Sequence, residues 1–454
     1  MHRSMLGKIG ILIVVSLMLL IPLMLIEGKV SERKSYLHEV KRAVETSWTG
    51  EQTLNAPLLV YPYEQTTDRN VTNQAGYIQG TQPVVEKKYA YISLDDLTVT
   101  THIVSSLRSK GIYSVPVYTA AIELKGELNR SKVTVALEAY RQEPGFSGFK
   151  RPYLSLAFSD PRGLDGIPKI QLNGRDYLAQ AGSGFSSIPG GINVMLNDET
   201  IQEKEVLSLE LSMALRGLQV FKFNPLANNV AFSIEADWPH PEFIGAFLPH
   251  HRDISAEGFN ATWKVNQFNT GGSAKMERCA NQDCQQMFAN AFGVNLFESV
   301  DVYQQTERAI KYAMLFIIVS FVAFFVFEAL KNLRIHPIQY TLVGLSIAIF
   351  YLLLIALSEH LPFVLAYSIA TSACVALIGF YLRFVLRGWS QSLGFSAALA
   401  ALYVMLFVIL QMEDFALLTG AVLTFSMLAG LMYSTRQIDW YQLATPTRKE
   451  GNTE

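Results

Sequence analysis

The chain is poor in cysteine, with three in 454 residues. This is too few for a disulfide scaffold. Cys374 lies in an apolar stretch, where a thiol packs as a small apolar side chain. Cys279 and Cys284 lie in a polar stretch, and we expect them to form a small-loop disulfide in an oxidising compartment, with free thiols as the alternative. A metal site is disfavoured because no nearby CxxC completes a set of four ligands.

Net charge and catalytic signatures are also scarce. The formal charge is −2, which argues against nucleic acid as a partner. No Walker loop, GxSxG elbow or paired-carboxylate signature stands out. Residues 189–191, Pro-Gly-Gly, lack the Lys and Ser/Thr of a phosphate cradle and are predicted to form a turn. The sequence therefore gives no sign of an enzyme, and we expect no cofactor.

Long apolar runs, in contrast, are abundant. Six stretches of about 18–20 residues have no charge in their middle, which is the length that a helix needs to cross a bilayer. They are residues 9–26, 312–330, 338–357, 363–382, 393–412 and 415–433. We therefore predict an integral membrane protein with six transmembrane helices: one at 9–26 and a five-helix bundle at 312–433. Residues 27–311 then form a large domain between helices 1 and 2.

Basic residues occur at the termini and in alternate short connections between these stretches. They are Arg3, Lys8, Lys331, Arg334, Arg383, Arg387, Arg436, Arg448 and Lys449, whereas the loops 358–362 and 413–414 contain no Lys or Arg. Short loops rich in Lys and Arg stay in the cytoplasm. We therefore expect residues 1–8 and the tail 434–454 to be cytoplasmic, and residues 27–311 to lie outside. No small-x-small cleavage site follows 9–26, so an uncleaved anchor is expected, with a cleaved signal peptide as the alternative.

The sequence of the outer segment, residues 27–311, predicts mainly β structure. Residues 31–48 have helical apolar spacing and are predicted to continue the first span as a helix that Gly50 ends. Thereafter, runs rich in β-branched and aromatic residues alternate with turn residues. These runs are 58–61, 113–128, 153–158, 206–220 and 229–236, and residues 70–81 read as a polar loop. We predict a β-rich domain, either an antiparallel sandwich or an α+β fold.

The densest polar cluster follows the last of these runs. It contains His240, His250, His251, Asp237, Glu242 and Asp253. Imidazole and carboxylate groups can bind metal, but the spacing matches no helical metal motif. Prolines 239, 241 and 249 predict an irregular loop that cannot be an interior strand. We expect a rigid contact surface, packed against the domain or the outer helix ends, formed by Trp238, Pro239, His240, Pro241, Phe243 and Phe247.

Three polar residues lie within or at the edge of the apolar stretches. Glu328 is the only acid well inside one, near its cytoplasmic end, and Lys331 lies one turn away. We expect these two to pair, with ion coupling as the alternative. Glu359 and His360 are predicted to cap the third span at the outer face, where the histidine could also sense pH. The absence of acids at any midplane argues against a proton- or sodium-coupled transporter.

Several segments resemble one family. They are WPHPEFIGAFLP at 238–249, AIKYAMLFIIVSFVAFFVFEAL at 309–330, HPIQY at 336–340 and IDWYQ at 438–442, with weaker matches in SDPRG at 159–163 and GIY at 111–113. The chain resembles the CreD family of bacterial inner-membrane proteins, which is associated with envelope integrity and colicin tolerance. Ala56, in place of an expected glycine, and the CANQDC loop depart from the family pattern. The resemblance implies an inner membrane with a periplasmic domain, and it supplies no biochemical activity.

Three functional hypotheses remain open. The first is a non-enzymatic inner-membrane protein that supports envelope integrity through its periplasmic domain. The second is a carrier or flippase-like protein for a lipid or amphiphile, and the third is a membrane-tethered periplasmic hydrolase. The expected partners are the lipid bilayer and other envelope proteins or lipids. A large apolar cavity would favour the second hypothesis, and a cleft of converging titratable groups would favour the third.

Overall fold

A computed structural model describes residues 5–72, 78–185, 189–271, 275, 289–296, 302–330, 335–385, 388–411 and 416–436. The chain divides into two compact units. One, the membrane unit, contains Met1–His38 and Val300–Glu454, and the other, the β-rich unit, contains Glu39–Ser299. Cys279, Cys284 and Lys331 lie outside the described residues, so the predicted disulfide and the predicted Glu328–Lys331 pair stay predictions.

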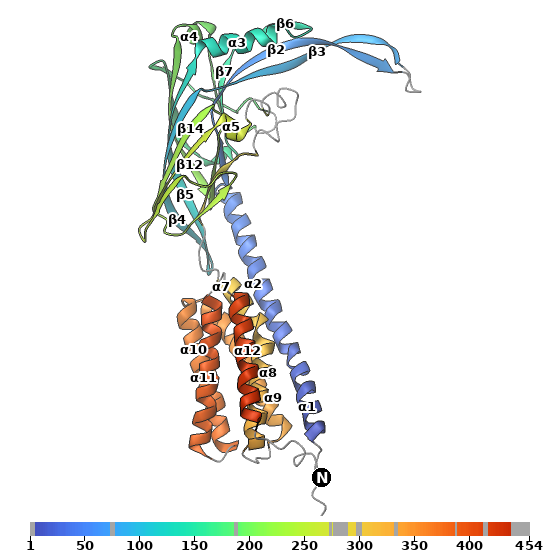
Figure 1. The fold of residues 1–454 in the computed structure, drawn as a ribbon. Helices are drawn as coiled ribbons and strands as arrows, with labels where there is room; N and C mark the ends of the chain where they lie inside the picture. The colour runs from blue at the N-terminus through green and yellow to red at the C-terminus, as the bar shows by residue number, and fades with distance from the viewer. Residues whose placement is uncertain are drawn as a thin grey trace, which may run out of the picture. The chain divides into compact units, whose positions relative to one another are not determined.

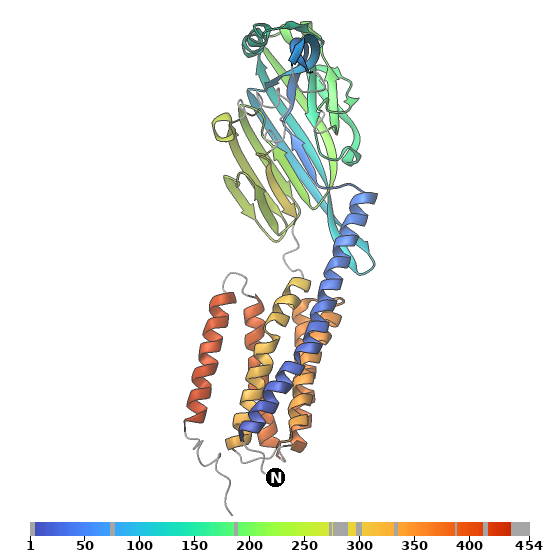
Figure 2. The ribbon, with the colours of Figure 1, turned by 90° about the vertical axis from the view of Figure 1, so that its right-hand side faces the viewer.

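The helices of the membrane unit run side by side (Figures 1 and 2). They are α1 (Met5–Met18), α2 (Leu20–Ser47), α7 (Val302–Lys311), α8 (Ala313–Leu330), α9 (Pro337–Ser358), α10 (Phe363–Val385), α11 (Trp389–Gln411) and α12 (Ala416–Thr435). Four helices in the described part of the chain are long and apolar enough to cross a membrane: 10–47, α9, α10 and α11. A fifth is added if α7 and α8, bent by 43° at their junction, count as one span. At the sixth apolar stretch the structure forms the 20-residue helix α12.

The first apolar stretch is helical with one break. Pro22 has no N–H for the carbonyl of Met18, and α1 gives way to α2 at Leu19. The hydrogen bonds from Leu19 N to Val15 O (3.0 Å) and from Leu23 N to Leu19 O (3.4 Å) continue the helical path. The predicted helix over 31–48 is confirmed, since α2 runs to Ser47 and ends just before Gly50.

One face of α1 and α2 packs into the membrane unit. Val15, Leu19, Leu23, Ile26 and Val30 are buried at spacings of three and four residues. Residues of the opposite face, such as Leu17, Ile21 and Met24, are exposed and apolar, as lipid contact requires. Small residues let membrane helices approach closely, and Gly344 of α9 does so here. A Cβ at Gly344 would overlap Leu19 Cδ1 and lie 2.8 Å from Phe321 Cζ.

The described residues of the β-rich unit form three sheets. The eight-stranded sheet has the order β16 (His251–Ile254), β17 (Phe259–Asn266), β14 (Asn229–Ala236), β4 (Asp96–Lys110), β5 (Tyr113–Asn129), β12 (Val206–Leu218), β8 (Leu164–Leu172) and β9 (Arg175–Tyr177). The six-stranded sheet has the order β10 (Gln180–Ala181), β11 (Gly191–Met195), β7 (Tyr153–Ala157), β2 (Leu58–Thr72) and β3 (Ile78–Ser93), with β6 (Phe146–Phe149) also paired to β2. The four-stranded sheet has the order β1 (Gln52–Asn55), β13 (Val220–Asn224), β18 (Phe292–Leu296) and β15 (Pro241–Gly245).

The predicted β-rich character is confirmed, but the sheets are not purely antiparallel. Strand β1 runs parallel to β13, and β14 runs parallel to β4. Short helices interrupt the strands: α3 (Arg130–Arg141), η1 (Pro161–Gly163), α4 (Asp198–Gln202) and α5 (Gln267–Thr270). The expected polar loop at 70–81 was wrong for residues 70–72 and 78–81, since Asn70 pairs with Thr81 in the β2–β3 hairpin, and residues 73–77 lie outside the described residues. This hairpin projects beyond the rest of the unit (Figure 1).

Strand alternation places the core between the sheets. In the first half of β12, from Val206 onward, exposed and buried residues alternate, so one face of the strand packs inward. The predicted strand at 206–220 breaks at Gln219, whose positive φ of 54° turns the chain from the eight-stranded into the four-stranded sheet. An aromatic cluster in this core joins Phe223, Phe232, Trp263 and Phe292, which have ring centroids 4.9–6.2 Å apart.

Candidate functional site

The segment 238–249, predicted as a contact surface, is only partly a loop. Its middle forms β15, an edge strand of the four-stranded sheet that begins at Pro241 and pairs with β18. The prediction of an irregular loop was therefore wrong for these residues, whereas the exclusion of an interior strand is confirmed. Proline is tolerated at the first residue of an edge strand because its missing N–H costs no ladder hydrogen bond there.

The aromatic residues of this segment pack against the core of the β-rich unit, as predicted. Phe243 lies edge-on to Phe259 and Trp263 at 5.7 and 5.9 Å, and Phe247 lies edge-on to Phe292 at 5.7 Å. Trp263 Nε1 donates to the carbonyl of Phe247 (3.1 Å). Trp238 is half-buried against the same core. His240, in contrast, is exposed, and among the described residues no three His, Cys, Asp or Glu side chains gather where they could hold a metal ion.

Glu328 is buried and has three partners among the residues that the structure describes. The carboxylate forms an ion pair with Lys8 Nζ of α1. Its Oε2 accepts a hydrogen bond from the Tyr340 hydroxyl (2.7 Å), and Oε1 accepts one from Ile335 N (3.2 Å). The carboxylate is thus enclosed, and its contacts join three helices: α1, α8 and α9. A charge in an apolar setting is tolerated when it is paired and hydrogen-bonded in this way.

The HPIQY segment positions Tyr340 for this contact. His336 caps α9, with its side chain accepting from Ile338 N (3.3 Å), and the Gln339 side chain accepts from His336 N (3.0 Å). Pro337 occupies the first turn, where its fixed φ favours helix initiation. One turn into the helix, Tyr340 is fully buried and reaches Glu328. The segment therefore builds a helix start that presents a hydroxyl to the acid.

A second set of ion pairs joins α2 to other helices of the membrane unit. Arg33 Nε lies 3.1 Å from Glu359 Oε1, at the C-terminal end of α9. Lys34 Nζ lies 3.2 Å from Glu307 Oε2 of α7, and the same carboxylate contacts Lys311 (3.1 Å). The predicted capping position of Glu359 is confirmed, while His360 is exposed.

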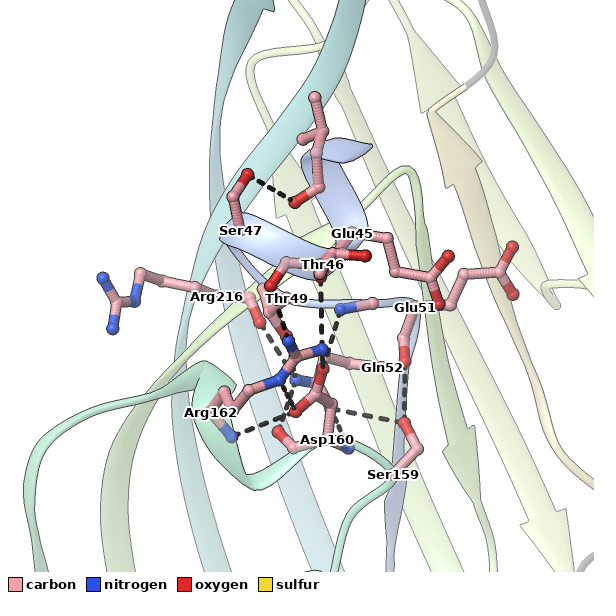
Figure 3. A network of polar contacts seen from close by, with 12 residues as sticks. Glu45, Thr46, Ser47, Thr49, Glu51, Gln52, Ser159, Asp160, Arg162 and Arg216 are labelled. Atoms are coloured by element: carbon pink, nitrogen blue, oxygen red, sulfur yellow. Dashed lines mark hydrogen bonds and ion pairs between the residues drawn. The ribbon is translucent and has the colours of Figure 1, made fainter. Parts of the chain in front are cut away.

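The C-terminal end of α2 is held inside the β-rich unit by the SDPRG segment (Figure 3). Arg162 donates to two carbonyls of the last turn, Thr46 O (2.9 Å) and Glu45 O (3.2 Å). Asp160 forms an ion pair with Arg162 (2.6 Å) and accepts from Gly50 N (2.9 Å). The last carbonyls of a helix have no partner within the helix, so a guanidinium that bridges them caps this end.

Gln52 extends this network into the core. The side chain is fully buried, and its amide nitrogen donates to Thr49 Oγ1 (3.1 Å) and to the carbonyls of Asp160 (2.9 Å) and Arg216 (3.0 Å). Its oxygen accepts from Asp160 N (3.2 Å). A Cβ on Gly163 would lie on top of this amide, so glycine is required there for steric reasons. Figure 3 shows these groups converging on Asp160.

Trp48 adds an aromatic clamp beside the network. The guanidinium groups of Arg108 and Arg216 lie 4.5 and 4.7 Å from its ring centroid. Cations at this distance are attracted by the ring quadrupole. The residues that leave α2 are therefore held by ion pairing, hydrogen bonding and cation–π contacts together. We call Trp48, Gln52, Asp160, Arg162 and Arg216 the α2 anchor.

The Arg162 guanidinium holds the pKa of Asp160 well below its usual range, and the hydrogen bonds from Gly50 and Arg162 backbone N–H groups act in the same direction. In the unfolded chain this pKa is about 3.9. A lowered pKa in the folded state means that Asp160 stabilises the fold fully at neutral pH. This stabilisation is lost as the pH falls below about 4, because the carboxyl group then protonates.

Comparison with known proteins identifies the family. Residues 4–441 match the family described as "Inner membrane protein CreD". The chain is also 35% identical to the "Inner membrane protein CreD" of Escherichia coli (strain K12), over 95% of this chain and 93% of that protein. The chain belongs to the CreD family.

The CreD resemblance was visible in the sequence, but the partners of its motifs were not. Lys8, Arg33 and Gln52 are ordinary polar residues in one dimension, and each meets a residue more than 100 positions away. In the sequence, the SDPRG segment is one of the weaker family matches, yet it supplies Asp160 and Arg162 of the α2 anchor. The available signal was the pairing of Asp and Arg two residues apart around a proline, which is typical of a capped turn.

We predict that Glu328→Gln in this CreD protein costs about 1.5–3 kcal/mol of stability, because it leaves Lys8 without its carboxylate partner. Lys8→Gln should cost a similar amount, and the double variant should cost less than both single changes together. Thermal unfolding of the four purified proteins in detergent measures this. Glu32→Gln, which removes an exposed acid of α2, is the control and should have almost no effect. Strict additivity would show that Lys8 and Glu328 are uncoupled.

We predict that Arg162→Ala loosens the last turn of α2. Hydrogen exchange at residues 45–50 should become about ten-fold faster, corresponding to about 1.4 kcal/mol of local opening free energy. Arg162→Lys should not restore protection, because a lysine cannot bridge two carbonyls and a carboxylate in one plane. Arg175→Ala removes an exposed arginine with a similar acid partner and is the matched control. Unchanged exchange at 45–50 in Arg162→Ala would contradict the capping role.

Proposed function

We propose that this CreD protein is a multi-pass inner-membrane protein with six spans and cytoplasmic termini. Its β-rich unit lies in the periplasm and supports cell-envelope integrity without catalysing a reaction. The proposal rests on one observation: helix α2 belongs to both units, and side chains of each unit bind the part of the helix that lies in it. Conditions sensed by the periplasmic unit reach the membrane helices along this helix.

Helix lengths and loop charges support the six-span arrangement. Counting α7 with α8 as one span and α12 as the last gives an even number, which puts both termini on one side. Lys and Arg flank the ends that this arrangement assigns to the cytoplasm, and the loops 358–362 and 413–414 have neither. The bend between α7 and α8 separates an amphipathic outer helix from an apolar membrane helix.

Two sets of contacts support transmission along α2. In the membrane unit, Arg33 and Lys34 form ion pairs with Glu359 and Glu307. In the β-rich unit, Arg162 caps the last turn. A helix satisfies its own backbone hydrogen bonds, so it can pass from lipid into water without a break in its ladder. The polar surface of α2 after Val30 agrees with such a passage.

The topology is tested with reporter fusions. Fusions after Ser35 and near Asn266 should report the periplasm, whereas fusions near Leu333, Trp389 and Glu450 should report the cytoplasm. Expression level serves as the control for each fusion. A periplasmic signal at Trp389 would refute the six-span arrangement.

Transmission along α2 is tested with Glu39→Pro, at an exposed position between the two sets of contacts. Proline inside a helix costs about 3 kcal/mol and interrupts it. In cells lacking the native protein, we expect Glu39→Pro to reach normal membrane abundance and to fail to restore survival under detergent stress. Glu39→Ala should restore survival fully. Full survival with Glu39→Pro at normal abundance would show that an intact α2 is not needed.

A further inference from the structure

A cleft of about 430 Å³ lies on the six-stranded sheet of the β-rich unit. Residues of β2, β3, β7 and β11 line it, together with the segment that leads into β7. Its volume is in the range of small-ligand sites in proteins. The cleft shares no residue with the α2 anchor, so the anchoring role leaves the cleft unexplained.

One wall of the cleft is aromatic. Tyr89 stacks on Tyr91 (6.2 Å, 17°), and Tyr91 stacks in turn on Phe185 (5.3 Å, 26°), so the Tyr89 ring is held at a fixed angle. Tyr153 lies buried beside them, and burial raises its pKa to about 12. Its hydroxyl therefore stays neutral and able to donate a hydrogen bond at every physiological pH. Gly184 packs directly on the Tyr153 ring, since a Cβ at Gly184 would lie 2.6 Å from the Tyr153 hydroxyl oxygen.

The rim of the cleft is basic. Lys87, Lys150 and Arg151 line it together with one acid, Glu64, which leaves a net charge of +2. Lys150 forms an ion pair with Glu64. Arg151 uses Nε to donate to the carbonyl of Leu196 (3.1 Å), which fixes the guanidinium plane. Its terminal nitrogens have no acceptor among the described residues. Lys87 is exposed and has no ion pair with the described residues.

These features select a ligand with a flat, partly apolar face and an acidic group. The faces of sugar rings carry C–H groups that pack on aromatic rings, and their hydroxyls match the Tyr153 hydroxyl and the Asn193 side chain that also lines the cleft. A carboxylate or phosphate on the sugar would meet Lys87 and Arg151. An acyl chain, in contrast, needs an enclosed apolar channel, and the charged rim offers none. We propose that the cleft binds an acidic carbohydrate of one or two rings.

Direct binding to the purified full-length protein tests this without depending on envelope survival. The probes are a uronic-acid disaccharide, a sugar phosphate, the neutral disaccharide cellobiose and inorganic phosphate, measured by calorimetry. We expect at least one acidic sugar to bind, and cellobiose and inorganic phosphate to bind at least about ten-fold more weakly. No binding of either acidic sugar, or equal binding of cellobiose or inorganic phosphate, would overturn the proposal. Whether the carboxylate or the phosphate sugar binds better identifies the acidic group.

Matched variants locate the site. Lys87→Gln and Tyr89→Leu should each weaken binding of the acidic sugar about ten-fold or more, with unchanged thermal unfolding. Lys169→Gln removes the same charge from an exposed position on β8, in another sheet, and should leave binding unchanged. Equal weakening by Lys169→Gln and Lys87→Gln would reduce the effect to overall charge and overturn the assignment of the cleft.

Discussion

A single helix, α2, has to satisfy two environments, and much of the structure depends on how it does so. Up to Ile26 its exposed positions are apolar, and from Glu27 onward they are largely polar or charged. The backbone needs no outside partner along the way, because each N–H bonds within the helix. Only the end at Ser47 leaves carbonyls unpaired, and there Arg162 supplies the donors. A helix ending inside a folded domain without such a cap would leave these groups unsatisfied.

Charges in the membrane unit act together with apolar packing. Burying a carboxylate such as Glu328 is costly, and its attraction to Lys8 offsets that cost only because Tyr340 and Ile335 also donate to it. Apolar contacts between Leu19 and Gly344 hold the same helices together without specifying how far one slides along the other. The ion pairs fix that register, since a shift of one helical turn would separate Lys8 from Glu328.

Patterns that act locally could be predicted from the sequence. The helical stretch at 31–48 and the strands at 113–128 and 229–236 all appear in the structure, because apolar periodicity acts over a few positions. The parallel pairing of β4 with β14 could not be predicted, since it joins residues more than 100 positions apart. The β2–β3 hairpin could not be predicted, because the halves of its strands nearest the turn are largely polar and lack the usual alternation of apolar and polar residues. For the same reason of distance, the ion pair of Glu328 with Lys8 could not be predicted, since 320 positions separate the two residues.

Arg33 and Lys34 are neighbours in the chain, and this has a mechanical consequence. Successive residues of a helix point about 100° apart around its axis, because 3.6 residues complete a turn. Their carboxylate partners, Glu359 and Glu307, belong to different helices, α9 and α7. Rotation of α2 about its own axis in either direction would draw at least one of these cations away from its partner. Small shifts along the axis cost less, because long side chains can follow them. These ion pairs therefore oppose rotation of α2 about its axis more strongly than they oppose small movements along it.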